Sequence, residues 1–404
     1  EALMEPAAYF EASRNAQKAA HHFHWENEKA TWQALIRRLH GEKTVHIWSM
    51  DRLEPPPYGG TLEVAGQVQN LVEDGYQVVV HATTKAGYTH PKALALREHP
   101  GVQFKTYPRN PWAILSAARP YTVGSRSTAP LKAALKTAKG HHIVQGTHLT
   151  GLDFPNSAVL RWHNPEARYY RSLSHHATGL EKVYLAWEAK KLERWESQLA
   201  KRWKGPVWAL TAGDAMVWEA LGGAPARVLP PQKRFLGELP TGDSPSPFVL
   251  VPGKFSVIEN ERAALWTTDL ALPVVWAGHG FSQILRDHAK AHGIDLLEEP
   301  DDAAMAQAFH NAQVVVVHAE HSLGLKLKLV QAMYQARWIV AHEAAVAGLD
   351  WTPEMGIRTY TSPETLAAAV VALQRASWDD ETRQAAVRAR RTWTSSLRLS
   401  QALD

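Results

Sequence analysis

Residues 314–334 read Val-Val-Val-Val-His-Ala-Glu-His-Ser-Leu-Gly-Leu-Lys-Leu-Lys-Leu-Val-Gln-Ala-Met-Tyr. The valine run is typical of a fully buried strand, and a helix is expected after Gly324. Such a junction is suited to phosphate, because a helix N-terminus carries partial positive charge. Lys326 and Lys328 are unfavourable at that end unless an anion lies between them. We interpret the segment as a site for the diphosphate of a nucleotide ligand. The alternative, in which both lysines point into water, stays open.

Length and composition limit the classes of protein. A chain of 404 residues favours two domains. The net charge of +4 suits anionic small ligands or an anionic membrane surface, and is too weak to indicate nucleic acid. The absence of cysteine excludes disulfides and thiolate metal sites, and fits a reducing cytoplasm. No apolar run reaches the length of a membrane span. We therefore expect a cytoplasmic protein, with peripheral contact at the inner face of the membrane as an open alternative.

Short β-branched runs alternate with helical stretches in both halves of the chain, which predicts parallel sheets covered by helices. The expected strands are 44–48, 77–81, 102–107, 142–145, 158–162 and 207–211, then 248–251, 274–277, 294–297, 313–317, 338–341 and 357–360. The fold class predicted is α/β, with two Rossmann-like doubly wound domains facing a central cleft and an N-terminal helical extension.

The expected boundaries follow from changes in composition. They are a helical N-terminal arm (1–40), a first domain (41–235), a Pro/Gly/Ser-rich linker (236–247), a second domain (248–376) and a C-terminal helix (377–404) that could cross back to the first domain. In the long helix after Gly179, Leu185 and Leu192 are expected on the buried face, with Glu188 and Lys191 on another.

Ligands of doubly wound sheets bind at the carboxyl ends of the strands. Polar residues and glycines follow several expected strands: Gly59 and Gly60, His148, His163, and Lys254. We expect Gly59 and Gly60 to form a turn that lets a phosphate approach the backbone, with Thr61 as the cap of the next helix. A plain tight turn is an equal alternative.

The segment after His163 has a complete helix-start pattern, with Asn164 as cap, Pro165 at the first helical position and Glu166 in the first turn. This pattern explains Asn164 and Pro165 structurally and leaves His163 unexplained. Basic residues in the helical region that follows, such as Lys182 and Lys191, could contact anionic lipid, although acidic residues interspersed among them favour an ordinary solvated surface.

Four segments together resemble the retaining glycosyltransferases of the GT-B fold, in the broad family-4 group with bacterial glycan-assembly members. They are Pro56-Pro-Tyr-Gly-Gly60, Leu160-Arg-Trp-His-Asn-Pro-Glu166, Gly253-Lys-Phe-Ser-Val-Ile-Glu-Asn260 and Gly324-Leu-Lys-Leu-Lys-Leu-Val-Gln-Ala-Met333. The resemblance covers roughly residues 43–350 and leaves the N-terminal arm uncovered.

The resemblance implies a role for each matched residue. Donor diphosphate binding falls to Gly59, Gly60, Lys254, Lys326 and Lys328; ribose binding to Gln331; catalysis to Glu320, His148 and, as second choice, His163; and the acceptor side to Glu166. Loops of the first domain between residues 110 and 128 are expected to recognise the acceptor.

Three positions depart from the family pattern, and one of them is Pro165, which stiffens the segment after His163. Gln331 stands where a glutamate is usual, and Glu259 stands where many relatives carry a second phosphate-binding lysine. The resemblance implies transfer of a hexose from a UDP- or GDP-linked sugar to a glycan or lipid-linked acceptor, with retained configuration and no metal or other cofactor. A non-catalytic scaffold and a nucleotide-sugar epimerase or hydrolase stay as alternatives, because a fold does not fix a function.

Overall fold

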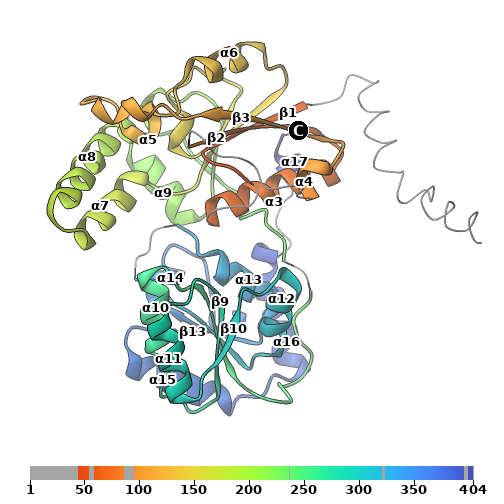
Figure 1. Cartoon of the computed structure of the whole chain (residues 1–404). Coiled ribbons are helices and arrows are strands. Elements are labelled where there is room, and N and C mark those ends of the chain that lie inside the picture. The colour runs from red at the N-terminus through yellow and green to blue at the C-terminus, as the bar shows by residue number, and fades with distance from the viewer. Residues whose placement is uncertain are drawn as a thin grey trace, which may run out of the picture.

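The computed structural model describes residues 44–53, 59–85, 95–235, 237–320, 324–394 and 399–403. The expected N-terminal arm and residues 56–58 lie outside the described residues. The described chain forms two α/β domains, one above the other in Figure 1, each built on a parallel sheet. This confirms the two α/β domains of the predicted fold class.

The first sheet has seven strands in the order β3-β2-β1-β4-β5-β6-β7. Its strands are β1 (Thr44–Ser49), β2 (Gln77–Thr84), β3 (Val102–Pro108), β4 (His141–Gln145), β5 (Val159–Trp162), β6 (Val207–Ala209) and β7 (Arg227–Val228). In the central register, Ile47 lies opposite Val80 on one side and Ile143 on the other.

Both faces of this sheet are covered by helices. The helices of the first domain are α3 (Gly59–Glu73), α4 (Ala95–Glu98), η2 (Pro111–Leu115), α5 (Tyr121–Gly124), α6 (Ala129–Thr137), η3 (Thr147–Leu149), α7 (Glu166–His176), α8 (Gly179–Arg202) and α9 (Ala212–Ala220). Along β1, Val45 and Ile47 pack into the core under α3, whereas Trp48 packs into the core under α6 and α8. This alternation is what a strand buried on both faces requires.

The second sheet has six strands in the equivalent order β10-β9-β8-β11-β12-β13. They are β8 (Val249–Lys254), β9 (Val274–His279), β10 (Asp295–Glu298), β11 (Val314–Val317), β12 (Trp338–His342) and β13 (Ile357–Tyr360). In β11, Val314 and Val316 belong to one core and Val315 and Val317 to the other, so all four valines are buried. The valine run therefore forms the central buried strand that its composition predicted.

The helices of the second domain follow the same alternation. They are α10 (Ile258–Leu265), α11 (Gln283–His292), α12 (Asp302–Asn311), α13 (Leu327–Gln335), α14 (Glu343–Val346), η4 (Pro353–Met355), α15 (Pro363–Gln374) and α16 (Asp380–Thr394). Arg390 of α16 is fully buried and donates to the carbonyl oxygens of Met355, Ala336 and Arg337 at 2.7–2.8 Å. It thereby satisfies carbonyl groups at the C-terminal end of α13.

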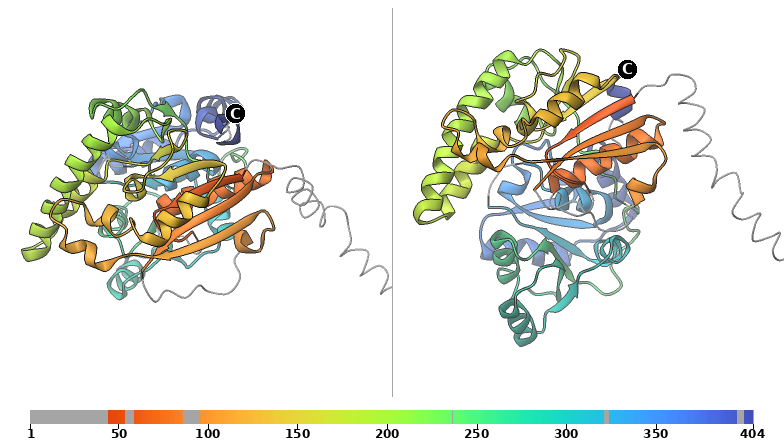
Figure 2. Two further views of the ribbon diagram at one scale, coloured as in Figure 1. Left: turned by 90° about the horizontal axis from the view of Figure 1, so that it is seen from above. Right: turned by 45° about the horizontal axis from the view of Figure 1, so that its top comes forward.

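The chain end returns to the first domain. The last helix, α17 (Leu399–Leu403), packs against α3, and Leu399 is buried in the core of the first domain. Figure 2 shows this C-terminal end beside the strands of the first sheet. The Arg-rich segment is thus two helices, α16 on the second domain and α17 on the first, whereas the sequence suggested one.

The expected linker is not a free connection. Leu239 is buried in the core of the second domain, the Asp243 carboxylate accepts from the Trp378 backbone amide at 2.7 Å, and Ser244 donates to the Asn311 carbonyl at 2.7 Å. Most of this Pro/Gly/Ser-rich segment is therefore packed on the second domain, because its backbone finds hydrogen-bond partners there.

Candidate functional site

A cavity of about 440 Å³ lies between the two domains, at the carboxyl ends of the first-domain strands. The predicted residues that line it are Gly59, Gly60, His148, His163 and Glu166. Met50, Asn164, Tyr169 and Tyr170 complete the first-domain wall, and Gly324 lines it from the second domain. The fold thus brings five of the ten predicted site residues to one hollow.

The domains approach each other closely around this cavity. A Cβ atom on Gly59 would lie 3.6 Å from the Leu327 side chain, and one on Gly324 would lie 3.7 Å from Cβ of Asn164. Gly324 has φ of +66°, a conformation that favours glycine. The N-terminus of α3, which begins at Gly59, therefore lies beside the N-terminus of α13, which begins at Leu327. The prediction of a glycine turn capped by Thr61 was wrong, since both glycines belong to the first turn of α3 and Thr61 is buried within the helix.

The two lysines of the opening stretch lie at the start of α13. Lys326 occupies its N-cap position, and Lys328 in the first turn donates to Oδ1 of Asn260 at 2.7 Å. Both side chains are half-buried. Burial, followed by the charge of Lys326, lowers the pKa of Lys328 to about 8, while Glu259 opposes this shift. Two half-buried cations at the positive end of a helix form a site that a bound anion would stabilise.

Further charged groups surround this helix start. Arg262 of α10 forms an ion pair with Glu320, which follows β11. His318, buried at the end of β11, lies with its Nε2 3.9 Å from the same carboxylate, and its Nδ1 is 2.7 Å from the Tyr360 hydroxyl. Burial lowers the pKa of His318 to about 3, and Lys328 and Arg262 act in the same direction. The imidazole is therefore neutral, and the positive charge here comes from the lysines and the arginine.

The remaining predicted residues of the second domain have different surroundings. Lys254 is exposed at the end of β8, where its carbonyl accepts from Asn260 at 2.9 Å. Gln331 donates to Gln335 one turn further along α13 at 3.0 Å. Glu320 is engaged by Arg262. Neither these side chains nor those of Lys326 and Lys328 belong to the lining of the interdomain cavity.

The two predicted histidines of the first domain are both neutral. His163 is buried, and burial together with Arg161 lowers its pKa to about 3. Its Nε2 lies 2.7 Å from the Gln145 side-chain oxygen, so this nitrogen carries the proton and Nδ1 is left as an acceptor. Burial and nearby Arg126 hold the pKa of His148 well below its usual range. Its Nδ1 is buried without a hydrogen-bond partner among the described residues. Neutral imidazoles at a reacting sugar could bond its hydroxyl groups without repelling developing positive charge.

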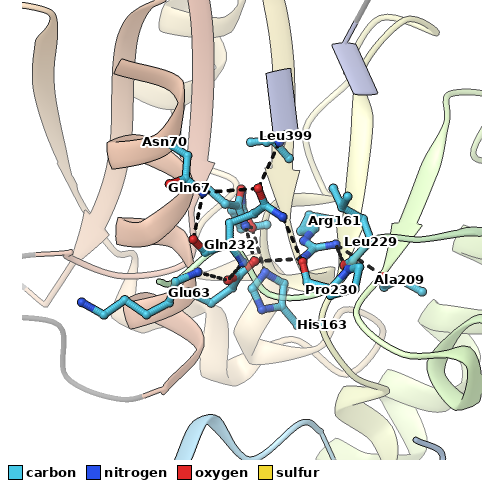
Figure 3. Close-up of polar contacts among 12 residues, drawn as sticks. Glu63, Gln67, Asn70, Arg161, His163, Ala209, Leu229, Pro230, Gln232 and Leu399 are labelled. Atoms are coloured by element: carbon cyan, nitrogen blue, oxygen red, sulfur yellow. Dashed lines mark hydrogen bonds and ion pairs between the residues drawn. The ribbon is translucent and has the colours of Figure 1, made fainter. Parts of the chain in front are cut away.

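A buried polar network in the first domain holds His163 in place by hydrogen bonds (Figure 3). Its centre is Glu63 of α3, whose carboxylate lies 2.9 Å from the Arg161 guanidinium. Gln67 donates to Glu63 at 3.0 Å and accepts from Gln145 at 2.7 Å, and Gln145 contacts His163. We call this set, together with Gln232, the Glu63 network.

The Glu63 network also ties distant parts of the chain together. The Glu63 carboxylate accepts from the backbone amide of Gln232 at 2.6 Å, and the Gln232 side chain accepts from the amide of Leu399 at 3.0 Å. Arg161 in addition donates to the Pro230 carbonyl at 3.0 Å. One buried cluster therefore joins α3, β5, the start of the interdomain connection and α17, as Figure 3 shows.

The acceptor-side residue Glu166 begins α7 and is buried. The predicted cap was wrong, because the N-cap residue is Pro165 and not Asn164, and Pro165 makes no side-chain capping bond. Instead the carboxylate of Glu196 on α8 accepts from the backbone amides of Glu166 at 2.7 Å and Ala167 at 3.3 Å. The first amides of a helix have no partner within the helix, and Pro165 has no side-chain acceptor to cap them, so they are satisfied by a residue thirty positions away, which local sequence does not reveal.

The carboxyls of Glu166 and Glu196 both titrate above their usual range. Burial raises the pKa of Glu166 to about 7, against the charge of Arg126 and a hydrogen bond from Asn164. Burial, and then the proximity of Glu166, raises the pKa of Glu196 to about 8. Glu166, which lines the cavity, is therefore partly protonated near neutral pH and can then donate to a ligand oxygen, whereas Glu196 is buried outside the lining.

A Glu166→Gln variant is expected to show this shift as a change in stability. A folded-state pKa of about 7 lies above the ordinary 4.5, so the folded protein binds the extra proton between these values and loses stability as pH rises through that window. Glutamine removes this loss. At pH 8 the variant should unfold with a free energy about 2 kcal/mol higher than the parent, and at pH 4 with nearly the same value.

Urea unfolding at both pH values measures this difference. Glu193→Gln is the matched control, because Glu193 is 55% exposed on α8 and pairs with Arg171 at the surface. Equal stability of parent and Glu166→Gln at pH 8 would show that Glu166 ionises normally.

Two arginines of the site were not predicted. Arg126 is buried and donates to the Met50 carbonyl at 2.9 Å, and Arg109 donates to the same oxygen at 3.0 Å. Arg109 also pairs with Asp51 at 2.7 Å. Both place positive charge behind the Met50 wall of the cavity. Arg126 belongs to the segment 110–128 that was expected on the acceptor side, but nothing in its local sequence indicates burial.

The predicted faces of α8 were partly wrong. Leu192 is buried as expected, but Glu188 and Lys191 are buried too and form an ion pair. The Lys191 ammonium donates to the Ser116 carbonyl at 2.9 Å, and the Tyr121 amide donates to Glu188 at 2.9 Å. The helix therefore packs on two faces, since the segment after η2 covers the side that sequence assigned to solvent. Lys191 accordingly does not belong to a basic surface.

Two kinds of feature, a metal site and a membrane-spanning helix, are absent from the residues that the structure describes. Among them, no group of three or more histidine or acidic side chains is arranged to hold a metal ion. No described helix is both long and apolar enough to cross a bilayer.

Comparison of the structure with solved proteins gives related architectures. Sucrose-phosphate synthase from Thermosynechococcus elongatus superposes with a TM-score of 0.63 at 11% identity, over 88% of this chain and 97% of that one. WaaG, a glycosyltransferase involved in lipopolysaccharide biosynthesis, gives 0.58 at 12% identity, over 89% and 98%. HepE of Anabaena, in complex with UDP and glucose, gives 0.56 at 12% identity, over 88% and 94%.

Sequence comparison does not extend this likeness. The chain matches no protein-family model, and no curated protein matches it in sequence. Identities of 11–12% establish the architecture only. With two parallel sheets of equivalent strand order, a cavity between them and neighbours matched over nearly their whole length, the chain has the GT-B fold.

Proposed function

We propose that this protein is a retaining glycosyltransferase, which moves a hexose from a UDP- or GDP-linked sugar to a glycan or lipid-linked acceptor without a divalent metal. The observation that carries the proposal is the close approach of two helix N-termini beside the interdomain cavity, which Gly59 and Gly324 line. The start of α3, with Gly59, faces the start of α13, with Lys326 and Lys328. A diphosphate bound there would meet two positive helix ends and two ammonium groups.

Charge explains why such a site would accelerate transfer. When the bond from the anomeric carbon to the donor phosphate oxygen breaks, negative charge grows on the diphosphate and the sugar becomes oxocarbenium-like. Fixed cations stabilise that charge more than they stabilise the bound donor. The depressed pKa of Lys328 supports this role, because an anion beside it would relieve repulsion from Lys326.

The side chains that line the cavity from the first domain suit the attack of the acceptor on the anomeric carbon. Glu166 lines the cavity, and because burial raises its pKa to about 7, only part of it is the nucleophilic carboxylate near neutral pH. This favours a front-face transfer, in which the acceptor oxygen bonds to the anomeric carbon on the side that the phosphate leaves. The acceptor proton passes to the departing phosphate oxygen. Neutral His148 and His163 would orient sugar hydroxyl groups, and Glu166 would donate to the acceptor.

The purified full chain should be incubated with a panel of UDP- and GDP-sugars, with and without glycan acceptors, in the presence of EDTA. We expect sugar transfer only from donors that carry one of the two bases, uracil or guanine. Proton NMR should show that the product keeps the anomeric configuration of the donor. An inverted product would contradict the front-face step, and loss of transfer in EDTA would contradict metal independence.

Two outcomes would point to the alternative functions. Sugar release or isomerisation without any acceptor would indicate a hydrolase or epimerase. Nucleotide binding without turnover would indicate a regulatory scaffold, which the Gln331–Gln335 bond and the Arg262–Glu320 pair would then explain by occupying two expected ligand contacts.

A further inference from the structure

A second cavity, of about 300 Å³, lies in the first domain on the far side of η3 from the interdomain cavity. His148 of η3 lines the interdomain cavity, and Thr150, directly after η3, lines the second one. Three cationic residues line it, Arg119, Arg202 and Lys204, against one acidic residue, Asp153. No role in the donor site uses these residues.

The cations are organised around one aromatic ring. Trp195 of α8 has its indole fixed by a hydrogen bond from Nε1 to the Thr150 hydroxyl at 2.9 Å. The guanidinium carbon of Arg202 lies 4.4 Å from the ring centroid, and that of Arg119 lies 5.7 Å from it. Arg202 also donates to the Thr150 carbonyl at 2.9 Å. Cation–π contacts and this bond hold two like charges around one ring.

The charge at this cavity is poorly compensated. Neither Arg119 nor Arg202 has a carboxylate within 4.0 Å among the residues that the structure describes. Burial, followed by the charge of Arg119, lowers the pKa of Arg202. The charge of Asp153 acts in the opposite direction but does not cancel this shift. An anion between the guanidinium groups would remove their mutual repulsion, and their planar donors suit carboxylate and phosphate oxygens.

Aromatic side chains form another part of the lining. Phe154 and Trp203 both line the cavity, with ring centroids 6.3 Å apart. These two rings line the cavity together with the cations, an arrangement that suits a ligand with one apolar face and one charged group. The C–H face of a pyranose ring and its acidic substituent meet that description.

We propose that this cavity binds an anionic carbohydrate, a sugar ring bearing a carboxylate or a phosphate group, between Arg119 and Arg202. The site is separate from the donor cleft, so it holds whether or not the chain transfers sugar. The ring packs on the aromatic side chains, and the acidic group lies between the guanidinium groups.

Calorimetric titration of the full chain with glucuronate, glucose 6-phosphate, glucose and inorganic phosphate tests the proposal. The two anionic sugars are expected to bind at least tenfold more tightly than glucose or phosphate. A higher salt concentration should lower the affinity of both anionic sugars. In an Arg119→Gln/Arg202→Gln variant their affinity should fall at least tenfold. Arg171→Gln is the matched control, because Arg171 is 52% exposed and pairs with Glu193 at the surface of the same helical region.

The outcomes separate the parts of the argument. Unchanged affinity in the double variant would overturn the site. Glucose binding as tightly as glucuronate would overturn the role of charge, and phosphate binding as tightly as glucose 6-phosphate would overturn the role of the aromatic rings. With this site saturated by an anionic sugar, the affinity for a nucleoside diphosphate should still be measurable in the same titration cell. A failure of the anionic-sugar proposal is therefore distinguishable from a failure of the donor assignment.

Discussion

Replacing Lys328 with alanine is expected to lower kcat/KM for the nucleotide-sugar donor about 10²–10³-fold, the usual cost of removing one preorganised partner of a developing negative charge. The ammonium is half-buried at the start of α13, is repelled by the charge of Lys326 and donates a hydrogen bond to Asn260. Steady-state kinetics and calorimetry with the nucleoside diphosphate measure the effect. Lys326→Ala should act in the same direction.

The same substitution has a second readout that a merely structural lysine would not give. Because the like charges of Lys326 and Lys328 repel each other in the free protein, Lys328→Ala should be at least as stable as the parent without ligand. The diphosphate should then raise the melting temperature of the parent and hardly raise that of the variant. Lys290→Ala, on the exposed end of α11, is the control. If Lys328→Ala binds the diphosphate as tightly as the parent, the diphosphate site lies elsewhere.

Replacing Glu63 with alanine is expected to lower the free energy of unfolding by about 3–5 kcal/mol, because it leaves the Arg161 guanidinium buried without its counter-charge. Both side chains are at most 2% exposed, and the carboxylate also accepts from the Gln232 amide. The substitution should also disturb the position of His163 in the interdomain cavity, since Gln67 and Gln145 connect Glu63 to His163. Urea unfolding measures stability, and kinetics of the surviving folded protein measures the effect on His163.

The control for Glu63 lies on the same helix. Glu73 of α3 is 43% exposed and faces Arg234 at 3.9 Å, so Glu73→Ala should cost well under 1 kcal/mol. A Glu63→Gln/Arg161→Met double variant should be destabilised by less than the sum of its single variants, because neither charge is then left alone. Additive losses would mean that the pair is not coupled.

The alternation of β-branched runs and helical stretches in the sequence was sufficient to predict the architecture of two parallel sheets. Every expected strand coincides with an observed one within a few residues, and the short β7 alone was not expected. Buried parallel strands read as continuous β-branched runs, so composition reveals them directly. The valine run of β11 is the clearest case, with all four side chains buried on alternating faces.

The candidate site was predictable where chemistry and chain position coincide. Residues directly after strands, such as His148 and His163, reach the cavity because parallel strands end at one edge of their sheet. Residues whose role depends on a distant partner were missed or misjudged. Arg126 contacts Met50 from 76 positions away, and Glu188 and Lys191 are buried by a segment that begins near Ser116.

Sequence alone determined that this chain has two parallel-sheet domains, and that cations would stand at the start of a helix following a central strand. These follow from local periodicity and from the fixed polarity of a helix. Only the tertiary structure decided which charges are compensated. Glu196 caps α7, Glu320 pairs with Arg262, and Arg119 and Arg202 share Trp195 without a close carboxylate among the described residues. The energy of a charge depends on its burial and on partners brought together by folding, and neither is written in its neighbours along the chain.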